Sequence, residues 1–342
     1  MLLEYKNAVF YGAGGVVGGA VARAFARRGR EDRHYQVYPG QARQGGRGLV
    51  KLVALAIFVL ALASACGTSG GASTKHEQSS TTETYSSEER EDLGGYFADS
   101  GVEGTFVMLD PQEERIVLYD PERAREPFLP ASTYKVPHAL IALETGVVSG
   151  PEYTIEWDPS LHPKEEWWPE VWAQGHTLET ALKNSVVWYF QEVAKRVRED
   201  RMQEYVDQFD YGNRDISGGI DRFWLTGGLR TSAKEQVEFL QRFYDGELGL
   251  SEKSTDVVKD MLVLEDTPEY RLGGKSGWVG LGEDSMEQVG WQVGYLEKGN
   301  EVYFYALNLD ISKPEDADAR LEITKDILRE LELTTRPEEP SR

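Results

Sequence analysis

The feature that most constrains the fold is the position of strand-like segments at both ends of one long body, residues 93–335. Apolar runs that alternate or are bounded by turn residues indicate β-strands. An apolar helical face at 317–333 closes the body, and helical and loop segments fill its middle. The strand-like runs lie at 104–109, 115–119, 270–279, 290–296 and 301–309. This order predicts an α/β (α+β) fold, in which one antiparallel sheet from both chain ends carries a helical insertion and the active site lies at their junction.

Ser132 and Lys135 stand at the start of an apolar helical pattern that runs on to Leu143. A separation of three residues places the lysine amine beside the serine hydroxyl within one helical turn. A serine is a poor nucleophile until a base takes its proton, and a helix N-terminus favours an oxyanion. The alternative is an ordinary N-cap serine followed by a solvated lysine. The pair is nevertheless a candidate for nucleophilic catalysis.

The charge and the cysteine count exclude several classes of function. The formal net charge is −21, and residues 1–65 carry nine basic and three acidic side chains, or +6, which leaves −27 for the remainder. A body with this much negative charge repels nucleic acid and anionic lipid. We therefore expect no nucleic-acid partner. The single cysteine, Cys66, forms no intrachain disulfide, and the five histidines lack metal-ligand spacing. We therefore expect no metal and no bound cofactor. These features do not indicate an oligomeric state.

Residues 1–30 suggest a different function from the rest of the chain. They predict a strand, a glycine turn and an alanine-rich helix, with Gly12, Gly14 and Gly18 in the turn. The segment resembles the start of a short-chain dehydrogenase, which makes a nicotinamide-dependent oxidoreductase one hypothesis. That fold needs a second strand ending in an acidic residue, whereas a run rich in Gly, Gln and Arg follows here. We therefore interpret residues 1–47 as a non-functional remnant or a mis-set start.

Residues 48–66 have the order of an export signal. Basic residues precede an apolar run at 52–65, and small residues lead directly into Cys66. The run is short for a membrane span, which needs about 20 residues. The cysteine resembles a bacterial lipoprotein cleavage site, which implies lipidation of Cys66 and an exported, membrane-anchored, extracytoplasmic protein. Ordinary signal cleavage and an uncleaved anchor are the alternatives. The polar composition of residues 67–92 predicts a flexible linker, and residues 336–342 form a tail.

Five short motifs of the body resemble those of class D serine β-lactamases in order and spacing, and the resemblance covers residues 93–333. They lie at 130–135, 185–187, 211–213, 223–225 and 275–277. The resemblance implies a serine β-lactamase or penicillin-binding transpeptidase-like fold and the hydrolysis of β-lactam small molecules. The alternative is a β-lactam sensor or penicillin-binding protein that is acylated without turnover. Tyr134, where the family usually has Phe, also occurs in such sensors, whereas Val187 favours the enzyme.

For the first motif the resemblance implies defined chemical roles. Ser132 is the nucleophile that opens the β-lactam ring and becomes acylated. Lys135 is modified by carbon dioxide to a carbamate (N6-carboxylysine) that acts as the general base, and burial supplies the neutral amine that this requires. The indole of Trp224 holds the carbamate, and Val187 and Leu225 cover it. The alternative for these three side chains is an ordinary place in the core.

The resemblance also assigns Ser185 and Lys275. Ser185 is a proton shuttle toward the leaving nitrogen of the substrate, and Lys275 supplies positive potential and hydrogen bonding at the edge of the cleft. The residue types suit these roles, because a hydroxyl both donates and accepts while an ammonium only donates. The alternative for Ser185 is a helix cap before the apolar run that begins at Val186.

The remaining predicted site residues bind the substrate. The resemblance implies that Ser276, beside Gly277, binds the substrate carboxylate, and that the backbone N–H groups of Ser132 and Trp278 form the oxyanion hole. Arg320, in the closing helix, corresponds to a carboxylate-binding arginine of the family. Because acidic residues surround Arg320 in the sequence, a simple surface ion pair is its alternative.

Overall fold

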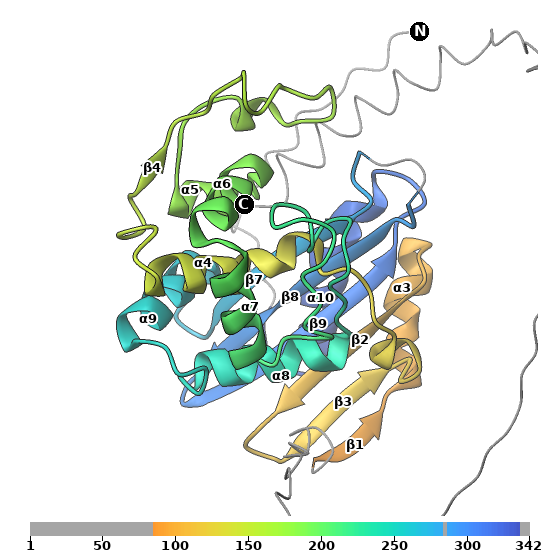
Figure 1. Cartoon of the computed structure of the whole chain (residues 1–342). Helices are drawn as coiled ribbons and strands as arrows, with labels where there is room; N and C mark the ends of the chain where they lie inside the picture. Colours follow the sequence, from red (N-terminus) through yellow and green to blue (C-terminus); the bar gives the residue numbers. More distant parts are fainter. Residues whose placement is uncertain (1–84, 283–285, 336–342) are drawn as a thin grey trace, which may run out of the picture.

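A computed structural model of the protein describes residues 85–282 and 286–335. Seven strands form one sheet in the order β1-β3-β2-β9-β8-β7-β6, and helices lie against both of its faces (Figure 1). The strands are β1 (Ser86–Glu89), β2 (Gly104–Asp110), β3 (Arg115–Tyr119), β6 (Val263–Asp266), β7 (Arg271–Val279), β8 (Val289–Lys298) and β9 (Glu301–Asp310). A separate two-stranded sheet pairs β4 (Thr154–Ile155) with β5 (His176–Thr177).

The pairing of β2 with β9 joins the two ends of the body. The strands run antiparallel, with Phe106 opposite Leu307 and Met108 opposite Tyr305. A hairpin links β2 to β3 on one side of this pair, and β9, β8 and β7 follow as an antiparallel meander on the other. The predicted fold class, a sheet built from both chain ends with a helical insertion between them, is confirmed.

One edge of the sheet differs from the prediction. Strand β1 pairs in parallel with β3, from Ser86 opposite Arg115 to Glu89 opposite Leu118, so the sheet is mixed rather than wholly antiparallel. The linker predicted for residues 67–92 is wrong over its last part, because β1 and the short helix η1 (Glu91–Leu93) lie there. The sequence of β1 has no alternation of apolar and polar residues, so hydrophobic periodicity gives no signal for it.

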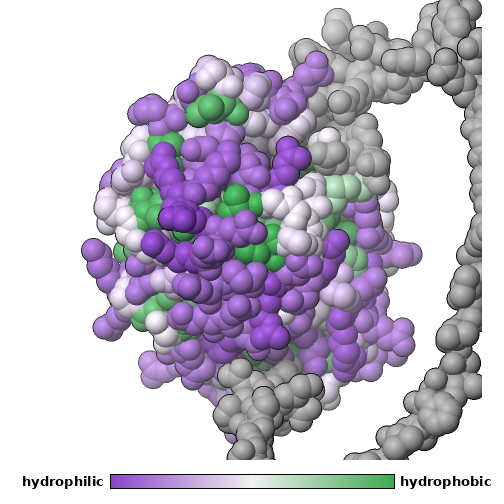
Figure 2. Space-filling view, viewed as in Figure 1, coloured by the Kyte–Doolittle hydropathy of each residue, from purple (hydrophilic) through white to green (hydrophobic). Residues whose placement is uncertain are grey.

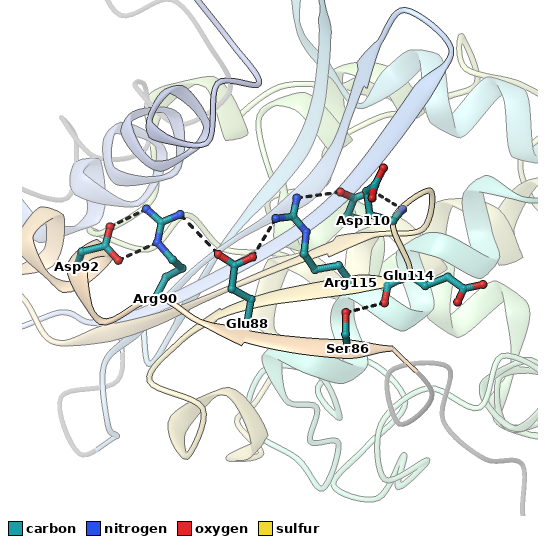
Figure 3. Close-up of polar contacts among 8 residues, drawn as sticks. Ser86, Glu88, Arg90, Asp92, Asp110, Glu114 and Arg115 are labelled. Atoms are coloured by element: carbon teal, nitrogen blue, oxygen red, sulfur yellow. Dashed lines mark hydrogen bonds and ion pairs between the residues drawn. The ribbon is translucent and has the colours of Figure 1, made fainter.

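A row of alternating charges holds β1 in place (Figure 3). Arg90 contacts Asp92 at 2.6 Å and Glu88 at 4.0 Å, and Arg115 then bridges Glu88 at 2.9 Å and Asp110 at 3.1 Å. Each exposed ion pair contributes only about 0–1 kcal/mol, but a connected row adds up along the strand. Charged side chains thus help to hold this edge strand, as they do in many natural sheets.

The helices belong to two groups by position in the chain. Among the described residues, the first and last α-helices cover one face of the sheet, and the others lie in the insertion between β3 and β6, which also contains short 3-10 turns. The helices are α3 (Gly94–Ser100), α4 (Lys135–Glu144), α5 (Leu178–Lys183), α6 (Val187–Val197), α7 (Glu199–Gln208), α8 (Ala233–Tyr244), α9 (Glu252–Met261), α10 (Asp316–Glu330), η2 (Arg123–Arg125), η3 (Ala131–Tyr134) and η4 (Glu170–Trp172).

Both faces of the sheet are buried, as strand β2 shows. Val107 and Leu109 point into the larger core, which α4, α6 and α8 complete, while Phe106 and Met108 point into the smaller core under α3 and α10. Each fully buried side chain of this size contributes about 1.5–3 kcal/mol relative to exposure. The sheet therefore serves as a rigid wall between two cores, and the insertion packs on one side of it.

Helix α10 ends three residues before its predicted end. Glu332 adopts a left-handed conformation with φ of 59°, and the N–H of Leu333 bonds to the carbonyl of Leu328 at 2.9 Å. This is the geometry that closes many helices. Within residues 85–282 and 286–335, no helix combines the length and apolar character that a membrane span requires.

Candidate active site

The Ser132 turn contacts strand β7 because only the first part of β7 is paired with β6, the neighbouring strand on that edge of the sheet. Strand β6 pairs with Arg271, Leu272 and Gly273 alone, so the later part of β7 faces η3 instead of another strand. A Cβ on Gly277 would lie 3.0 Å from the carbonyl oxygen of Pro130 and 3.2 Å from a Thr133 methyl group. Glycine at position 277 therefore lets the strand come close to the turn.

Several hydrogen bonds from distant elements hold that turn. The indole of Trp291 on β8 donates to the carbonyl of Leu129 at 2.9 Å. The Thr133 hydroxyl donates to Pro130 at 2.7 Å and accepts from Gln236 of α8 at 2.9 Å. Ala131 takes a φ of 47°, which is strained for a residue with a side chain. The residue before Ser132 is thus held in a conformation that the surrounding bonds impose.

Ser132 lies in a 3-10 turn that runs into α4 and does not cap a helix. The N-cap of the turn is Pro130 and that of α4 is Tyr134, so the N-cap alternative for Ser132 is wrong. The Ser132 hydroxyl is half-buried at the cleft and accepts a hydrogen bond from the Lys135 amine at 2.7 Å. This contact is the one that the spacing of the two residues predicts.

Lys135 is fully buried, which excludes the alternative of a solvated first-turn lysine. Its Nζ lies 5.6 Å from the ring centroid of Phe190. Burial, and next the positive charge of Lys275, holds the pKa of Lys135 well below its usual value. An amine in this position is neutral at a pH where a solvated lysine is protonated, so it can act as a base or a nucleophile.

Trp224 contributes an indole N–H that has no partner among the described residues. The side chain is completely buried in the larger core, and its Nε1 makes no hydrogen bond. The backbone carbonyl of Trp224 accepts from the N–H of Ala131 at 3.0 Å, which fixes this segment beside the Ser132 turn. Because buried donors are nearly always paired, this one calls for an acceptor in the interior.

Ser185 and Lys275 form a second serine–lysine pair across the cleft. The Lys275 amine donates to the Ser185 hydroxyl at 3.1 Å and to the Ser276 carbonyl at 2.8 Å. Ser185 has a φ of 57° and does not cap α6, whose N-cap is Val186, so the cap alternative is wrong. Burial and the nearby charge of Arg320 lower the pKa of Lys275 to about 7.

Arg320 points inward, so the alternative of a surface ion pair is wrong. Its side chain is 6% exposed, donates to the carbonyl of Gly277 and lies 5.9 Å from the Trp278 ring centroid. Burial lowers the pKa of Arg320 to about 10. Within the described part of the chain, no carboxylate lies within 4.0 Å of the Lys135 or Lys275 amine or of the Arg320 guanidinium. Arg320 and the protonated fraction of Lys275 therefore give one point of a strongly acidic protein a positive potential, to which a neutral Lys135 adds nothing.

These groups border a cleft of about 440 Å³, a volume typical of small-molecule sites. Lys135, Trp224 and Lys275 lie behind its surface. Among the described residues, the predicted site residues that line the cleft itself are Ser132, Ser185, Val187, Leu225, Ser276, Gly277, Trp278 and Arg320. Figure 2 shows the face viewed in Figure 1 as mostly hydrophilic with small hydrophobic patches.

Sequence reasoning missed part of the cleft wall. Trp167, Trp168 and Trp172 line it, and the rings of the first two lie 5.5 Å from that of Trp172. Three tryptophans within six residues are visible in the sequence, but prolines and charged residues interrupt the segment, so no continuous apolar period indicates where it lies. Such a wall suits an apolar or aromatic substituent on a ligand.

The comparisons with known proteins agree with this geometry. The family model of the penicillin binding protein transpeptidase domain matches residues 104–329. The β-lactamase OXA-10 of Pseudomonas aeruginosa is 42% identical over 68% of this chain and 84% of its own length. The regulatory protein BlaR1 of Bacillus licheniformis is 32% identical over 70% of this chain but only 39% of its own length.

A solved structure narrows the class further. The class D β-lactamase YbXI from Nostoc superposes with a TM-score of 0.67 and 38% identity, covering 72% of this chain and 100% of the other. The fold and the serine–lysine site thus define a penicillin-binding, transpeptidase-like protein. Within that class, the chain belongs to the class D β-lactamase family, as the five motifs predict.

Among the described residues, no group of three or more His, Cys, Asp or Glu side chains could hold a metal ion.

Two further predictions, the oxidoreductase hypothesis and the lipid anchor, concern the N-terminal part of the chain. Gly12, Gly14, Gly18 and Cys66, together with the predicted signal and most of the linker, lie outside the described residues. The oxidoreductase hypothesis and the lipid anchor therefore stay predictions.

Proposed function

We propose that the chain hydrolyses β-lactams through an acyl-enzyme on Ser132. The observation that carries this proposal is the 2.7 Å contact between the hydroxyl of Ser132 and the buried amine of Lys135 at the base of the cleft. The Ser132 oxygen attacks the carbonyl carbon of the strained ring amide, and the carbon–nitrogen bond breaks. The serine proton finally reaches the freed nitrogen, and water later cleaves the ester.

The base in this scheme is a carbamate on Lys135. A neutral lysine amine attacks carbon dioxide, a nitrogen–carbon bond forms and one amine proton is released. When present, the carbamate takes a proton from Ser132 and then from the deacylating water. The surroundings suit it, because Lys135 is fully buried and the indole N–H of Trp224, which has no partner among the described residues, is a donor that needs an acceptor. Val187 and Leu225, both partly buried in the cleft wall, limit the access of water.

The other site residues act on the substrate. Ser185, hydrogen-bonded to Lys275, is placed to pass a proton to the leaving nitrogen, and the backbone N–H groups of Ser132 and Trp278 serve as oxyanion donors. Ser276 and Arg320 bind the carboxylate that penicillins and cephalosporins carry beside the ring. The positive charge of Arg320 and of protonated Lys275, which have no carboxylate partner among the described residues, favours that orientation.

Steady-state turnover of nitrocefin by the full chain tests the proposal. We expect sustained turnover in bicarbonate buffer, loss of rate in degassed buffer and recovery when bicarbonate is added. A single stoichiometric burst without steady state would indicate an acylated sensor instead. A full rate in degassed buffer would contradict the carbamate and leave Lys135 acting as a free amine.

A pair of variants isolates the role of Trp224. Trp224→Phe and Trp188→Phe each remove one indole N–H from a fully buried side chain. The Trp188 N–H already bonds to the carbonyl of Trp172 at 2.8 Å, whereas that of Trp224 has no partner among the described residues. We expect only Trp224→Phe to raise the bicarbonate concentration that gives half the maximal rate. Equal bicarbonate dependence in both variants would contradict a special role for Trp224.

We also propose that the protein is exported and held at the membrane through a lipidated Cys66. The apolar run at 52–65 and the cysteine directly after it support this location. Residues 1–47 would then be discarded, and the polar stretch from 67 to the start of β1 would tether the catalytic domain. One acyl chain anchors only marginally, so more than one is required. Mass spectrometry of the mature chain tests this, and a soluble chain that begins beyond Cys66 would contradict it.

A further inference from the structure

His138 is a buried imidazole for which the mechanism above has no use. It lies on α4, one helical turn after Lys135, and its side chain is completely inaccessible to solvent. Neither Nδ1 nor Nε2 has a hydrogen-bond partner among the described residues. Buried polar groups in native proteins are almost always paired, so two unpartnered nitrogens on one ring require an explanation.

Another histidine of the same chain shows the usual arrangement. His176 is also buried, but its Nε2 contacts the carbonyl of Val171 at 2.7 Å and its Nδ1 contacts the hydroxyl of Thr180 at 3.1 Å. Both nitrogens of His176 are therefore satisfied by neighbouring protein atoms. The described residues thus pair one buried histidine, whereas they leave both ring nitrogens of His138 without a hydrogen bond.

The surroundings of His138 are almost entirely aromatic. Its ring centroid lies 4.4 Å from that of Trp224, 4.6 Å from that of Tyr134 and 5.8 Å from that of Phe190. The Tyr134 hydroxyl points to the sulfur of Met202 at 3.5 Å. Besides these aromatic groups, the side chain whose charge acts on His138 is Lys135 in its protonated form, which lies on the same face of α4.

His138 is held in its neutral form. Burial, and next the charge of Lys135, keeps the pKa of His138 well below its usual value. A neutral imidazole has one N–H donor and one acceptor nitrogen. Together with the Trp224 indole, the pocket around Lys135 thus holds two buried donors without a partner in the described part of the chain.

We propose that His138 is a positioning residue for the carbamylated form of Lys135. The ring N–H donates a hydrogen bond to the carbamate, directly or through one internal water, and so complements the donor that Trp224 supplies. An unmodified amine already donates to Ser132 and offers little to a second donor, whereas a carbamate brings two acceptor oxygens. The two donors therefore favour the modified lysine over the free one and raise the affinity of the chain for carbon dioxide. This inference rests on the carbamate of the proposed function.

The test measures carbamate formation without any substrate. The full chain is titrated with 13C-labelled bicarbonate, and the carbamate carbon is followed by NMR to obtain an apparent dissociation constant for carbon dioxide. We expect His138→Leu, which removes both nitrogens, to weaken this affinity about tenfold or more, the effect of losing a hydrogen bond to a charged group.

Two conservative variants identify the nitrogen that is used. The amide of His138→Asn places its NH2 near the position of Nδ1, and that of His138→Gln places it near Nε2. We expect one of them to keep an affinity within about threefold of the wild type, the scale of ordinary context effects. His176→Asn is the matched control, and it should leave carbon dioxide binding unchanged. If His138→Leu, His138→Asn and His138→Gln all bind carbon dioxide as the wild type does, His138 is only a core residue and the inference is overturned.

A measurement on the wild-type protein covers the case in which His138→Leu does not fold. In 15N-histidine-labelled protein, the ring resonances of His138 should shift when bicarbonate is added, while those of His176 stay in place. A carbamate signal in the 13C spectrum without any shift of His138 overturns the inference. Absence of a carbamate signal altogether would instead contradict the base assigned in the proposed function, so the two failures are distinguishable.

Discussion

Two serine–lysine pairs border the cleft, and they differ in how the chain brings them together. Ser132 and Lys135 lie three residues apart, and their side chains meet at 2.7 Å within one turn. Ser185 and Lys275 lie 90 residues apart, and the packing of the insertion against β7 brings them to 3.1 Å. The chemical groups are the same, but the surroundings of the two lysines are not.

The surroundings separate the roles of the two pairs. Lys135 lies behind the cleft surface beside Phe190, so its amine is stabilised in the neutral form that a base requires. Lys275 donates to two oxygen acceptors near the cleft, and its pKa of about 7 leaves it partly charged at neutral pH. A buried amine without other polar contacts suits nucleophile activation, and a hydrogen-bonded one suits proton transfer and substrate binding.

The largest expected effect is the loss of β-lactam hydrolysis when Ser132, rather than Ser185, is replaced. Ser132→Ala removes the nucleophile, so hydrolysis should fall by about 10⁴-fold or more. Intact-mass spectrometry after incubation with penicillin should show no adduct in Ser132→Ala and a normal adduct in Ser185→Ala. An adduct that persists in Ser132→Ala would mean that the pairs have been assigned the wrong way round.

Removing the first lysine should slow deacylation more than acylation. In Lys135→Ala no base is left to activate the water, and general-base catalysis contributes about 10²–10⁴-fold. The penicillin adduct on Ser132 should therefore form and then persist, as its mass measured over time will show. Lys183→Ala, at an exposed lysine of α5, is the control and should turn over normally. Rapid loss of the adduct in Lys135→Ala would contradict the role of the base.

The second lysine should matter less. Lys275→Gln keeps a donor but loses the charge, and loss of a charge-assisted hydrogen bond lowers kcat/KM by about 10- to 100-fold. Because Ser185→Ala breaks the same contact, the double variant should be little worse than either single one. Steady-state kinetics of the three variants give this coupling, and fully additive losses would show that the two residues act separately.

The smallest effect is a pH dependence that distinguishes the lysines. Lys275 is protonated below its pKa of about 7 and loses its charge above it. With bicarbonate saturating, kcat/KM should therefore decline on the alkaline side from near pH 7, by about tenfold per pH unit. A bound substrate carboxylate favours the charged form of Lys275. The alkaline decline of kcat should therefore begin at a higher pH than that of kcat/KM. The alkaline limb should be absent in Lys275→Gln, and its persistence would assign it to another group.

Much of the fold could be predicted because its signals are local. The hairpin of β2 and β3 and the strands β7, β8 and β9 have apolar residues on both faces and turn residues at their ends. Strand β1 could not be predicted, because Arg90, Arg115 and their acidic partners hold it and a charged strand has no hydrophobic period. The parallel pairing at that edge follows from contacts that no local pattern encodes.

By itself the sequence determined that Ser132 and Lys135 can meet, since a separation of three residues within a helical turn brings their side chains within reach of each other. Only the tertiary structure decided that Lys135 is buried, that Ser185 faces Lys275 and that Arg320 reaches the carbonyl of Gly277. The physical reason is that desolvation and long-range contacts depend on all the elements packed around a residue. The same dependence left both ring nitrogens of His138 without a hydrogen-bond partner among the described residues, which the place of His138 in a helical pattern does not reveal.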